Sequence, residues 1–401
     1  MACLPPPLPF PRALSPSLPF TQSAVSAAVV YHPRYQDYNF GPEHPFSPDR
    51  LAMLTELLQA LDRWQEPVAP PVATVDEVRT VHAEAFVEQV QAAGSGSPPP
   101  NAKQFGLDTA DVPVFADMDA AARGLVGGTL HAARLIAEGD ATRVLQLGGG
   151  LHHAQQRLAS GFCVYNDLSV AIQHLRQRDY RVAYLDIDVH HGDGVQWIHY
   201  GDPGVLTLSL HESGRYLFPG TGGAQELGEG GARGSALNVP LEPYTENESY
   251  LEAFDRVVPY AFEQFRPDVL IVQCGADAHH SDPLADLMLT TDAYEPLFQQ
   301  IFDLADTHTD GRCVLTLGGG YRFDATVRIW ALLYLMATGQ DLPEALPSDW
   351  RSRWQNQLDE PISKTLLDAP REFDVPRRDT IEQQNRRVSK RLMELAAPLW
   401  Y

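Results

Sequence analysis

The sequence predicts an α/β fold in which a single parallel sheet is covered by helices on both faces. The first observation is a set of short, nearly continuous apolar runs that end abruptly in glycine or polar residues. Such runs are expected of strands that are buried on both faces of a sheet. The predicted strands are Ala28–Tyr31, Val144–Leu147, Val182–Leu185, Val205–Leu210, Val269–Val272 and Val314–Leu317.

The second observation is that helix-like stretches alternate with these runs, as in sheets whose parallel strands are joined by helices. The clearest are Ser169–Arg178, Glu248–Phe265, Asp292–Ala305 and Ala325–Ala337. We expect one catalytic domain over residues 25–342, with the GSGSPPP stretch at 94–100 as a loop. Residues 1–24 are a proline-rich, flexible leader in this interpretation, and residues 343–401 form a C-terminal extension that packs on the domain.

Composition narrows the class of protein. A net charge of −22 argues against direct binding to nucleic acid or to an anionic membrane, although it suits a lysine-rich substrate as well as plain solubility. Four cysteines without C-x-x-C spacing fit a reducing compartment, so a cytoplasmic location is expected. Prolines interrupt each apolar run of the leader within a few residues. The runs are therefore too short for a signal peptide or a membrane helix. The oligomeric state is not indicated.

The third observation is that polar residues follow four of the predicted strands. In open α/β sheets, ligands bind beyond the carboxyl ends of the strands. His152 and His153 follow one strand after three glycines, and Asp186 to Gly194 ends another. Gly275 to Asp277 ends a third, and Gly318 to Tyr321 a fourth.

These residues suggest a metal site. Asp186, Asp188 and His190 alternate along an extended segment, so they share one face. The alternative is that Asp188 caps a turn while His190 is merely hydrogen-bonded. Asp277, at another strand end, favours the metal. A set of two aspartates and one histidine with an open position is typical of catalytic sites, with Zn²⁺ as the default and Fe²⁺ as an alternative.

Three further side chains suggest acid–base and oxyanion chemistry. A glycine-rich loop can turn His152 and His153 toward one cleft, where Asp186 and Asp193 would orient them. Tyr321 could donate a hydrogen bond to a developing oxyanion. Surface histidines and a packing tyrosine are the alternatives. A second pair, His279-His280, fits a rim or surface position at least as well as a functional one, and neither triple glycine matches a nucleotide-binding motif.

Taken together, these motifs resemble the zinc-dependent histone deacetylase superfamily, and most of all its bacterial acetoin-utilisation branch. The likeness runs from about Val29 to about Leu342, and D-x-D-x-H-H-G-D-G is its most specific part. GGGL departs from the serine, glycines and tryptophan that many members have before the paired histidines. The motifs are GGGLHHA (148–154), ASGFCVYND (159–167), LDIDVHHGDGV (185–195), FPGTG (218–222), GAD with DP (275–277, 282–283) and LGGGY (317–321).

The resemblance implies an arginase-like fold with an eight-stranded parallel sheet. It implies that Asp188, His190 and Asp277 hold the zinc, that His152 and His153 are the catalytic pair bonded to Asp186 and Asp193, and that Tyr321 polarises the amide carbonyl. It also implies a K⁺ or Na⁺ site formed by Asp186, Asp188, His190, Ser209 and Leu210.

The resemblance further implies a narrow substrate tunnel. Phe162 and Phe218 would form its walls, with Gly161 and Leu284 nearby, and Asp108 would grip the substrate at the rim. Arg50 would line an internal channel for acetate. The expected substrate is an acetylated lysine of a protein or peptide. Acetylpolyamines or other small acylated amines are the alternative, and a non-catalytic binding module is disfavoured because every residue that the chemistry needs is present.

Overall fold

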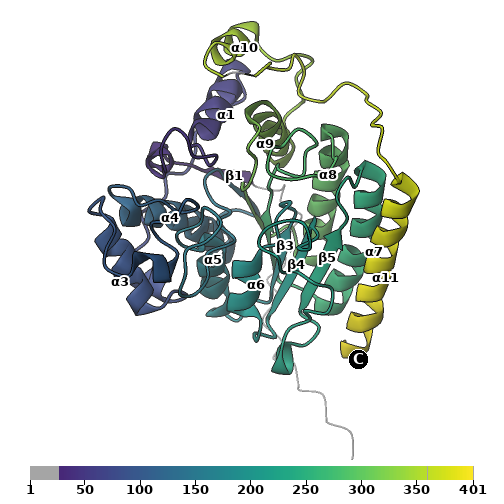
Figure 1. Ribbon diagram of the computed structural model, residues 1–401, viewed down its shortest axis with the longest axis horizontal. Helices are drawn as coiled ribbons and strands as arrows, with labels where there is room; N and C mark the ends of the chain where they lie inside the picture. Colours follow the sequence, from purple (N-terminus) through teal and green to yellow (C-terminus); the bar gives the residue numbers. More distant parts are fainter. Residues whose placement is uncertain (1–26, 359, 401) are drawn as a thin grey trace, which may run out of the picture.

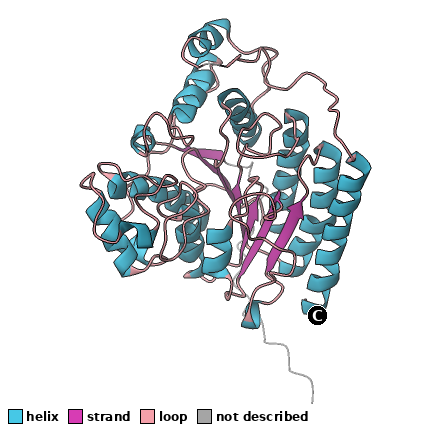
Figure 2. Ribbon diagram, viewed as in Figure 1, coloured by secondary structure: helices cyan, strands magenta, loops and turns pink. Residues whose placement is uncertain are grey.

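The computed structural model describes residues 27–358 and 360–400, so the predicted leader at 1–24 lies outside the described residues. At its centre is a seven-stranded sheet in the order β1-β2-β7-β6-β3-β4-β5, with every neighbouring pair parallel (Figures 1 and 2). The strands are β1 (Ala27–Val30), β2 (Arg143–Gln146), β3 (Val182–Asp186), β4 (Val205–Glu212), β5 (Ala236–Leu241), β6 (Val269–Gln273) and β7 (Cys313–Thr316).

The predicted fold class is confirmed, and each of the six predicted runs coincides with a strand to within two residues at either end. The strand that the sequence did not reveal is β5, whose residues include Asn238 and Pro240. Proline lacks an amide hydrogen and is tolerated at a sheet edge, which is where β5 lies.

The resemblance implied eight strands, whereas the described residues form seven. Beyond β1, at the opposite edge of the sheet, Val68 makes an isolated parallel bridge with Val30. The amide of Val68 donates to the carbonyl of Val29 at 2.8 Å, and the amide of Tyr31 donates to the carbonyl of Val68 at 3.3 Å. This single bridge stands where an eighth strand would extend the sheet.

In every strand except the edge strand β5, residues contribute to two different hydrophobic cores, one on each face of the sheet. In β3, Ala183 and Leu185 join the core beneath α1, α7, α8 and α9, while Val182 and Tyr184 join the core beneath α4 and α5. This is the period-two alternation of a strand buried on both faces. The helices are α1 (Asp49–Ala60), α2 (Val75–Arg79), α3 (Glu84–Ala93), α4 (Met118–Glu138), α5 (Asp167–Arg176), α6 (Asp193–His199), α7 (Asn247–Phe265), α8 (Thr291–His308), α9 (Phe323–Ala337), α10 (Ser348–Gln355) and α11 (Arg378–Ala396).

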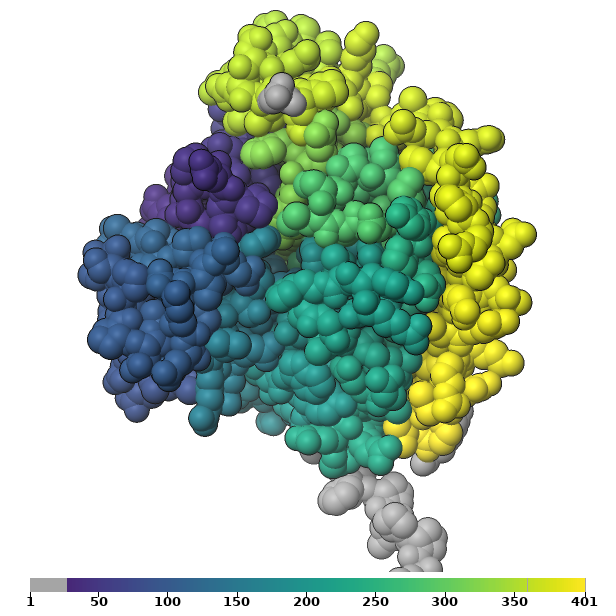
Figure 3. All heavy atoms as spheres, viewed as in Figure 1, coloured from purple at the N-terminus to yellow at the C-terminus, as the bar shows by residue number. Residues whose placement is uncertain are grey.

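Both helices of the C-terminal segment pack against the rest of the chain. In α10, the indole of buried Trp350 donates to the carbonyl of Met53 in α1 at 3.1 Å. Helix α11 lies along α7 beside the β5 edge (Figure 1), and its atoms form the yellow side of the molecule in Figure 3. There, the side chain of buried Asn385 accepts from the amide of Glu242 and donates to Thr245. Helix α11 thereby covers an edge strand that would otherwise be open to pairing.

Among residues 27–358 and 360–400, every helix is too short or too polar to span a lipid bilayer.

Candidate active site

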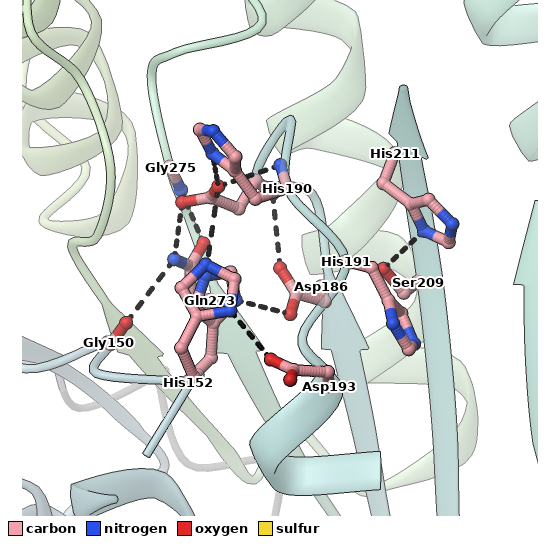
Figure 4. A network of polar contacts seen from close by, with 12 residues as sticks. Gly150, His152, Asp186, His190, His191, Asp193, Ser209, His211, Gln273 and Gly275 are labelled. Atoms are coloured by element: carbon pink, nitrogen blue, oxygen red, sulfur yellow. Dashed lines mark hydrogen bonds and ion pairs between the residues drawn. The ribbon is translucent and has the colours of Figure 1, made fainter. Parts of the chain in front are cut away.

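The four polar strand ends meet because their strands β2, β7, β6 and β3 are consecutive neighbours in the sheet. All of them run in the same direction, so their carboxyl ends share one edge. Figure 4 shows the result, with the residues after β3 facing Gln273 and Gly275 at the end of β6, and with Gly150 and His152 beside them.

Asp188, His190 and Asp277 form a compact group of metal-ligating side chains. One ligand atom from each lies within 4.8 Å of the others, and all three residues are buried. Nδ1 of His190 lies 3.1 Å from Oδ1 of Asp188 and 3.2 Å from Oδ2 of Asp277. The imidazole and the two carboxylates therefore converge on one small volume.

The remaining carboxylate oxygens of this group are held by hydrogen-bond donors. Oδ2 of Asp188 accepts from the Gln273 amide group at 2.6 Å and from the Gly319 backbone at 2.9 Å. Oδ1 of Asp277 accepts from the Val189 backbone at 2.9 Å. Each carboxylate is thus held through one oxygen by these donors, while its other oxygen lies beside Nδ1 of His190. Hydrogen bonds of this kind orient the side chains that bind a metal.

The charges of the group also fit a divalent cation. Burial and the neighbouring charge of Asp188 raise the pKa of Asp277, because two buried carboxylates at this separation repel each other. A bound cation would remove that repulsion. Two carboxylates and one neutral imidazole suit Zn²⁺ or Fe²⁺ with a position left open for water and substrate.

His152 and His153 are both buried and each is paired with a different aspartate. Nδ1 of His152 donates to Oδ2 of Asp186 at 2.8 Å, and Nδ1 of His153 donates to Oδ1 of Asp193 at 2.7 Å. The sequence analysis placed these four residues together, and the structure brings them together. Asp186 also accepts from the hydroxyl of Tyr184 at 2.6 Å, a contact that the sequence did not indicate.

The two histidines differ in their affinity for protons. Burial opposes protonation of His152, but the charges of Asp186 and Asp188 outweigh it and raise its pKa to about 9. Burial and the neighbouring charge of His152 lower the pKa of His153 to about 4, despite its bond to Asp193. At neutral pH the pair therefore combines a cationic His152 with a neutral His153.

Tyr321 follows the glycines of the loop after β7, and its ring lies near that of His190. Its backbone amide donates to Oδ2 of Asp282 at 2.7 Å, and its ring centroid is 6.5 Å from that of His190. Burial and the charges of Asp277 and Asp188 raise the pKa of Tyr321 well above its usual range. Its hydroxyl therefore keeps its proton and can act as a donor.

Phe162 and Phe218 lie on different sides of the group. The Phe162 ring contacts that of Tyr321 at 5.7 Å, whereas the Phe218 ring contacts those of His153 at 5.0 Å and His190 at 6.5 Å. Phe218 is 46% exposed, which places it at the opening to solvent. These contacts agree with an aromatic-walled passage leading down to the buried group.

Gly161 packs against His153, since a Cβ at this glycine would meet the imidazole at 2.2 Å. The amide of Gly161 donates to Asp111 at 2.6 Å. The sequence analysis named Asp108 for the rim. Asp108 lies in the same loop and is half-buried, but Asp111 is the acidic residue with a bond to the passage wall. Leu284 is half-buried, with its amide bonded to Asp282 at 3.0 Å.

Arg50 is buried behind Tyr321. Its guanidinium donates to the carbonyls of Gly318 at 3.2 Å and Gly320 at 2.7 Å, and its Cζ lies 5.7 Å from the Tyr321 ring. It lines a small pocket of about 20 Å³ together with Trp330. This is enough space for about one water molecule.

The predicted monovalent-cation residues are neighbours as well. Asp186 of β3 and Ser209 of β4 are register partners, with Leu210 next along β4. The Ser209 hydroxyl lies 2.8 Å from Nδ1 of the buried His211, which the sequence analysis did not single out.

His279 and His280 do not join this site. With Asp368 they form a second group whose potential ligand atoms lie close together. Nε2 of His279 bonds to Asp368 at 2.9 Å, and the same carboxylate accepts from the Arg328 guanidinium at 2.9 Å. The positive charge of the guanidinium already balances the Asp368 carboxylate, so we interpret this group as an ionic anchor for the C-terminal segment.

Comparison with known proteins agrees with this geometry. Residues 44–336 match the histone deacetylase domain model. The chain belongs to the histone deacetylase family. It is 41% identical to acetoin utilization protein AcuC of Bacillus subtilis (strain 168) over 373 residues, 91% of this chain and 96% of that protein. AcuC of Staphylococcus aureus (strain MSSA476) is 37% identical over 375 residues, 92% of this chain and 96% of that protein.

Solved structures of this deacetylase family have the same fold. An HDAC homologue complexed with SAHA superposes with a TM-score of 0.82 at 27% identity, covering 91% of this chain and all of the other. An HDAC homologue from Aquifex aeolicus gives 0.81 at 26% identity, with 90% and 99% covered. The resemblance inferred from the motifs is therefore confirmed, and the chain is a deacetylase of the histone deacetylase family.

Proposed function

We propose that this deacetylase is a metal-dependent hydrolase that removes acetyl groups from lysine side chains of proteins or peptides. The observation that carries the proposal is the convergence of Asp188, His190 and Asp277 beside two buried histidines, each of which is hydrogen-bonded to its own aspartate. A buried set of two carboxylates and an imidazole, next to a base and a hydroxyl donor, is equipped for metal-assisted amide hydrolysis.

Asp188, His190 and Asp277 would hold the metal, Zn²⁺ by default and Fe²⁺ as the alternative. When bound, it supplies Lewis acidity that polarises the acetyl carbonyl and acidifies water. Asp186 and Ser209, with the carbonyls around them, would hold a structural K⁺ or Na⁺. These assignments rest on the donor geometry and on family membership.

His153 is the general base. It is neutral at physiological pH, and its bond to Asp193 leaves Nε2 free to accept a proton from the attacking water. It then returns a proton to the departing lysine amine. His152, held cationic by Asp186, contributes positive charge as the carbonyl oxygen becomes negative. Tyr321 donates a hydrogen bond to that oxygen.

The passage favours a slim, uncharged chain. Phe162 and Phe218 supply aromatic walls for the lysine methylenes, and Leu284 supplies apolar surface without a negative charge that would bind a second cationic amine. Cleavage of acetylpolyamines is the second candidate, because the protein as a whole is strongly acidic. The names of the relatives further suggest a role in acetoin utilisation, and we propose that this role is performed in the cytoplasm.

A direct comparison of substrates tests the proposal. We expect kcat/KM for an acetyl-lysine peptide to exceed that for an acetylpolyamine. A tenfold or greater preference for the polyamine would contradict the lysine assignment.

Metal content tests the other half of the proposal. Purified protein should contain close to one divalent ion per chain, and Asp188→Ala should lose it while remaining folded. Full metal retention in folded Asp188→Ala would contradict the ligand assignment.

A further inference from the structure

Three adjoining hollows run along one side of α11. Their volumes are about 480, 590 and 360 Å³. The first and second share Glu242 and Gln384 in their linings, and the second and third share Tyr244 and Ile381. The three hollows therefore adjoin one another, and together they are here called the α11 trough. Its walls come from this helix, from the loops after β4 and β5, from the start of α7 and from residues 371–373.

Two exposed tyrosines stand in the middle of the trough. Tyr216 is 60% exposed and Tyr244 is 48% exposed, and both line the 590 Å³ hollow together with Pro376 and Ile381. Tyr244 also has a backbone φ of +64°, which is unfavourable for a bulky residue. The fold thus holds an aromatic ring in solvent on a strained backbone. Such strain and such exposed apolar surface are characteristic of binding sites.

Two loops connect the walls of the trough with residues at the opening of the active site. Tyr216 precedes Phe218, the exposed wall of the passage, by two residues in one loop. On the other side, the amide of Tyr244 bonds to the carbonyl of Asp286 at 2.7 Å, two residues after Leu284. Tyr216, Phe218 and Tyr244 are also the three most exposed large apolar side chains among the described residues.

We infer that the α11 trough binds the polypeptide on which the acetylated lysine is carried. This inference rests on the proposed function and specifies it. The part of the trough between Arg377 and Arg391 spans about 20 Å of helix, which would accommodate about six residues of extended chain. A large apolar side chain close to the acetyl-lysine packs between Tyr216 and Tyr244. Small acylated amines enter the passage without reaching the trough.

The test compares a long and a minimal substrate in matched variants. The substrates are a peptide of about nine residues with central acetyl-lysine and flanking leucines, and a blocked single acetyl-lysine. Tyr244→Gly removes the ring at a position where glycine is conformationally favoured, so its fold should be retained. Tyr216→Ser is the second variant. Trp197→Ala, which removes an exposed aromatic that lines none of the three hollows, is the control.

We expect each tyrosine variant to lower kcat/KM for the peptide by about tenfold, mainly through KM, as for loss of an aromatic binding contact. For the blocked single residue, the value should stay within about twofold of wild type, and Trp197→Ala should change neither substrate. Equal losses on both substrates, or no loss on the peptide, would overturn the inference. If the wild-type protein turns over neither acetyl-lysine substrate, the proposed function fails, and the trough inference fails with it.

Discussion

Gly319 is the position where the smallest change should remove the metal. A Cβ added there would lie 1.9 Å from Oδ2 of Asp277 and 2.6 Å from Oδ2 of Asp188. Because real Cβ atoms keep about 3.0 Å from such neighbours, the Asp277 oxygen would have to move by at least 1.1 Å, the difference between 3.0 and 1.9 Å. Metal–ligand distances tolerate only about 0.2 Å. Gly319→Ala should therefore bind the metal at least about 100-fold more weakly than wild type.

The assay is metal content after dialysis, followed by competition with a chelator. Gly231→Ala is the matched control, since its added Cβ would meet nothing within 4 Å. Asp277→Asn adds no bulk but removes one anionic ligand, so it should weaken binding in the same direction even if Gly319→Ala folds poorly. Circular dichroism and thermal unfolding establish that each variant is folded. Wild-type metal affinity in folded Gly319→Ala would refute the ligand geometry proposed here.

Three further predictions address the reaction, the substrate and the C-terminal anchor. Tyr321→Phe should fold normally but lose about 10²–10³ in kcat, and wild-type kcat would mean that Tyr321 only packs. Leu284→Glu should shift the ratio of kcat/KM values toward an acetylpolyamine, and an unchanged ratio would place Leu284 away from the opening. Hydrogen bonding to His279 and the charge of Arg328 outweigh burial and hold the pKa of Asp368 below its usual range. Its stabilising effect should therefore be complete above about pH 4, the pKa of the unfolded carboxyl, and should decrease at lower pH. Urea unfolding should show wild type more stable than Asp368→Asn at pH 6, with a smaller difference at pH 3. A constant difference would contradict the ionic anchor.

The fold was predictable because burial on both faces makes a strand visible as an apolar run. Six strands could be predicted from such runs. The seventh, β5, did not, because Asn238 and Pro240 interrupt its apolar pattern. An edge strand pairs with a neighbour on one side only, so a residue without an amide hydrogen or with a polar side chain is tolerated there more easily. The weaker sequence signal of β5 follows from its place in the sheet.

The site was predictable to the extent that its residues stand in short motifs at strand ends. Tyr184 and Gln273, which support Asp186 and Asp188, lie inside apolar strands and resemble ordinary core residues in the sequence. Gln273 could have been recognised from the sequence, because a polar residue at the end of an apolar run, two positions before Gly275, indicates a residue of the site. A buried amide group requires hydrogen-bond partners, and those of Gln273 are the Asp188 carboxylate and the backbone of Gly150 and Gly275.

Asp111 shows why contacts between distant loops could not be predicted from the sequence. Its bond to Gly161 joins two loops that are fifty residues apart, and no local pattern encodes that contact. The α11 trough has the same origin, since its walls come from the loops after β4 and β5 and from a helix more than a hundred residues later. The residues of the proposed metal site are brought together by strand ends, and they stand in short motifs. The surface that we infer to bind the acylated polypeptide is assembled from distant segments. The tyrosine variants of the trough therefore test a property of this chain that its family motifs do not determine.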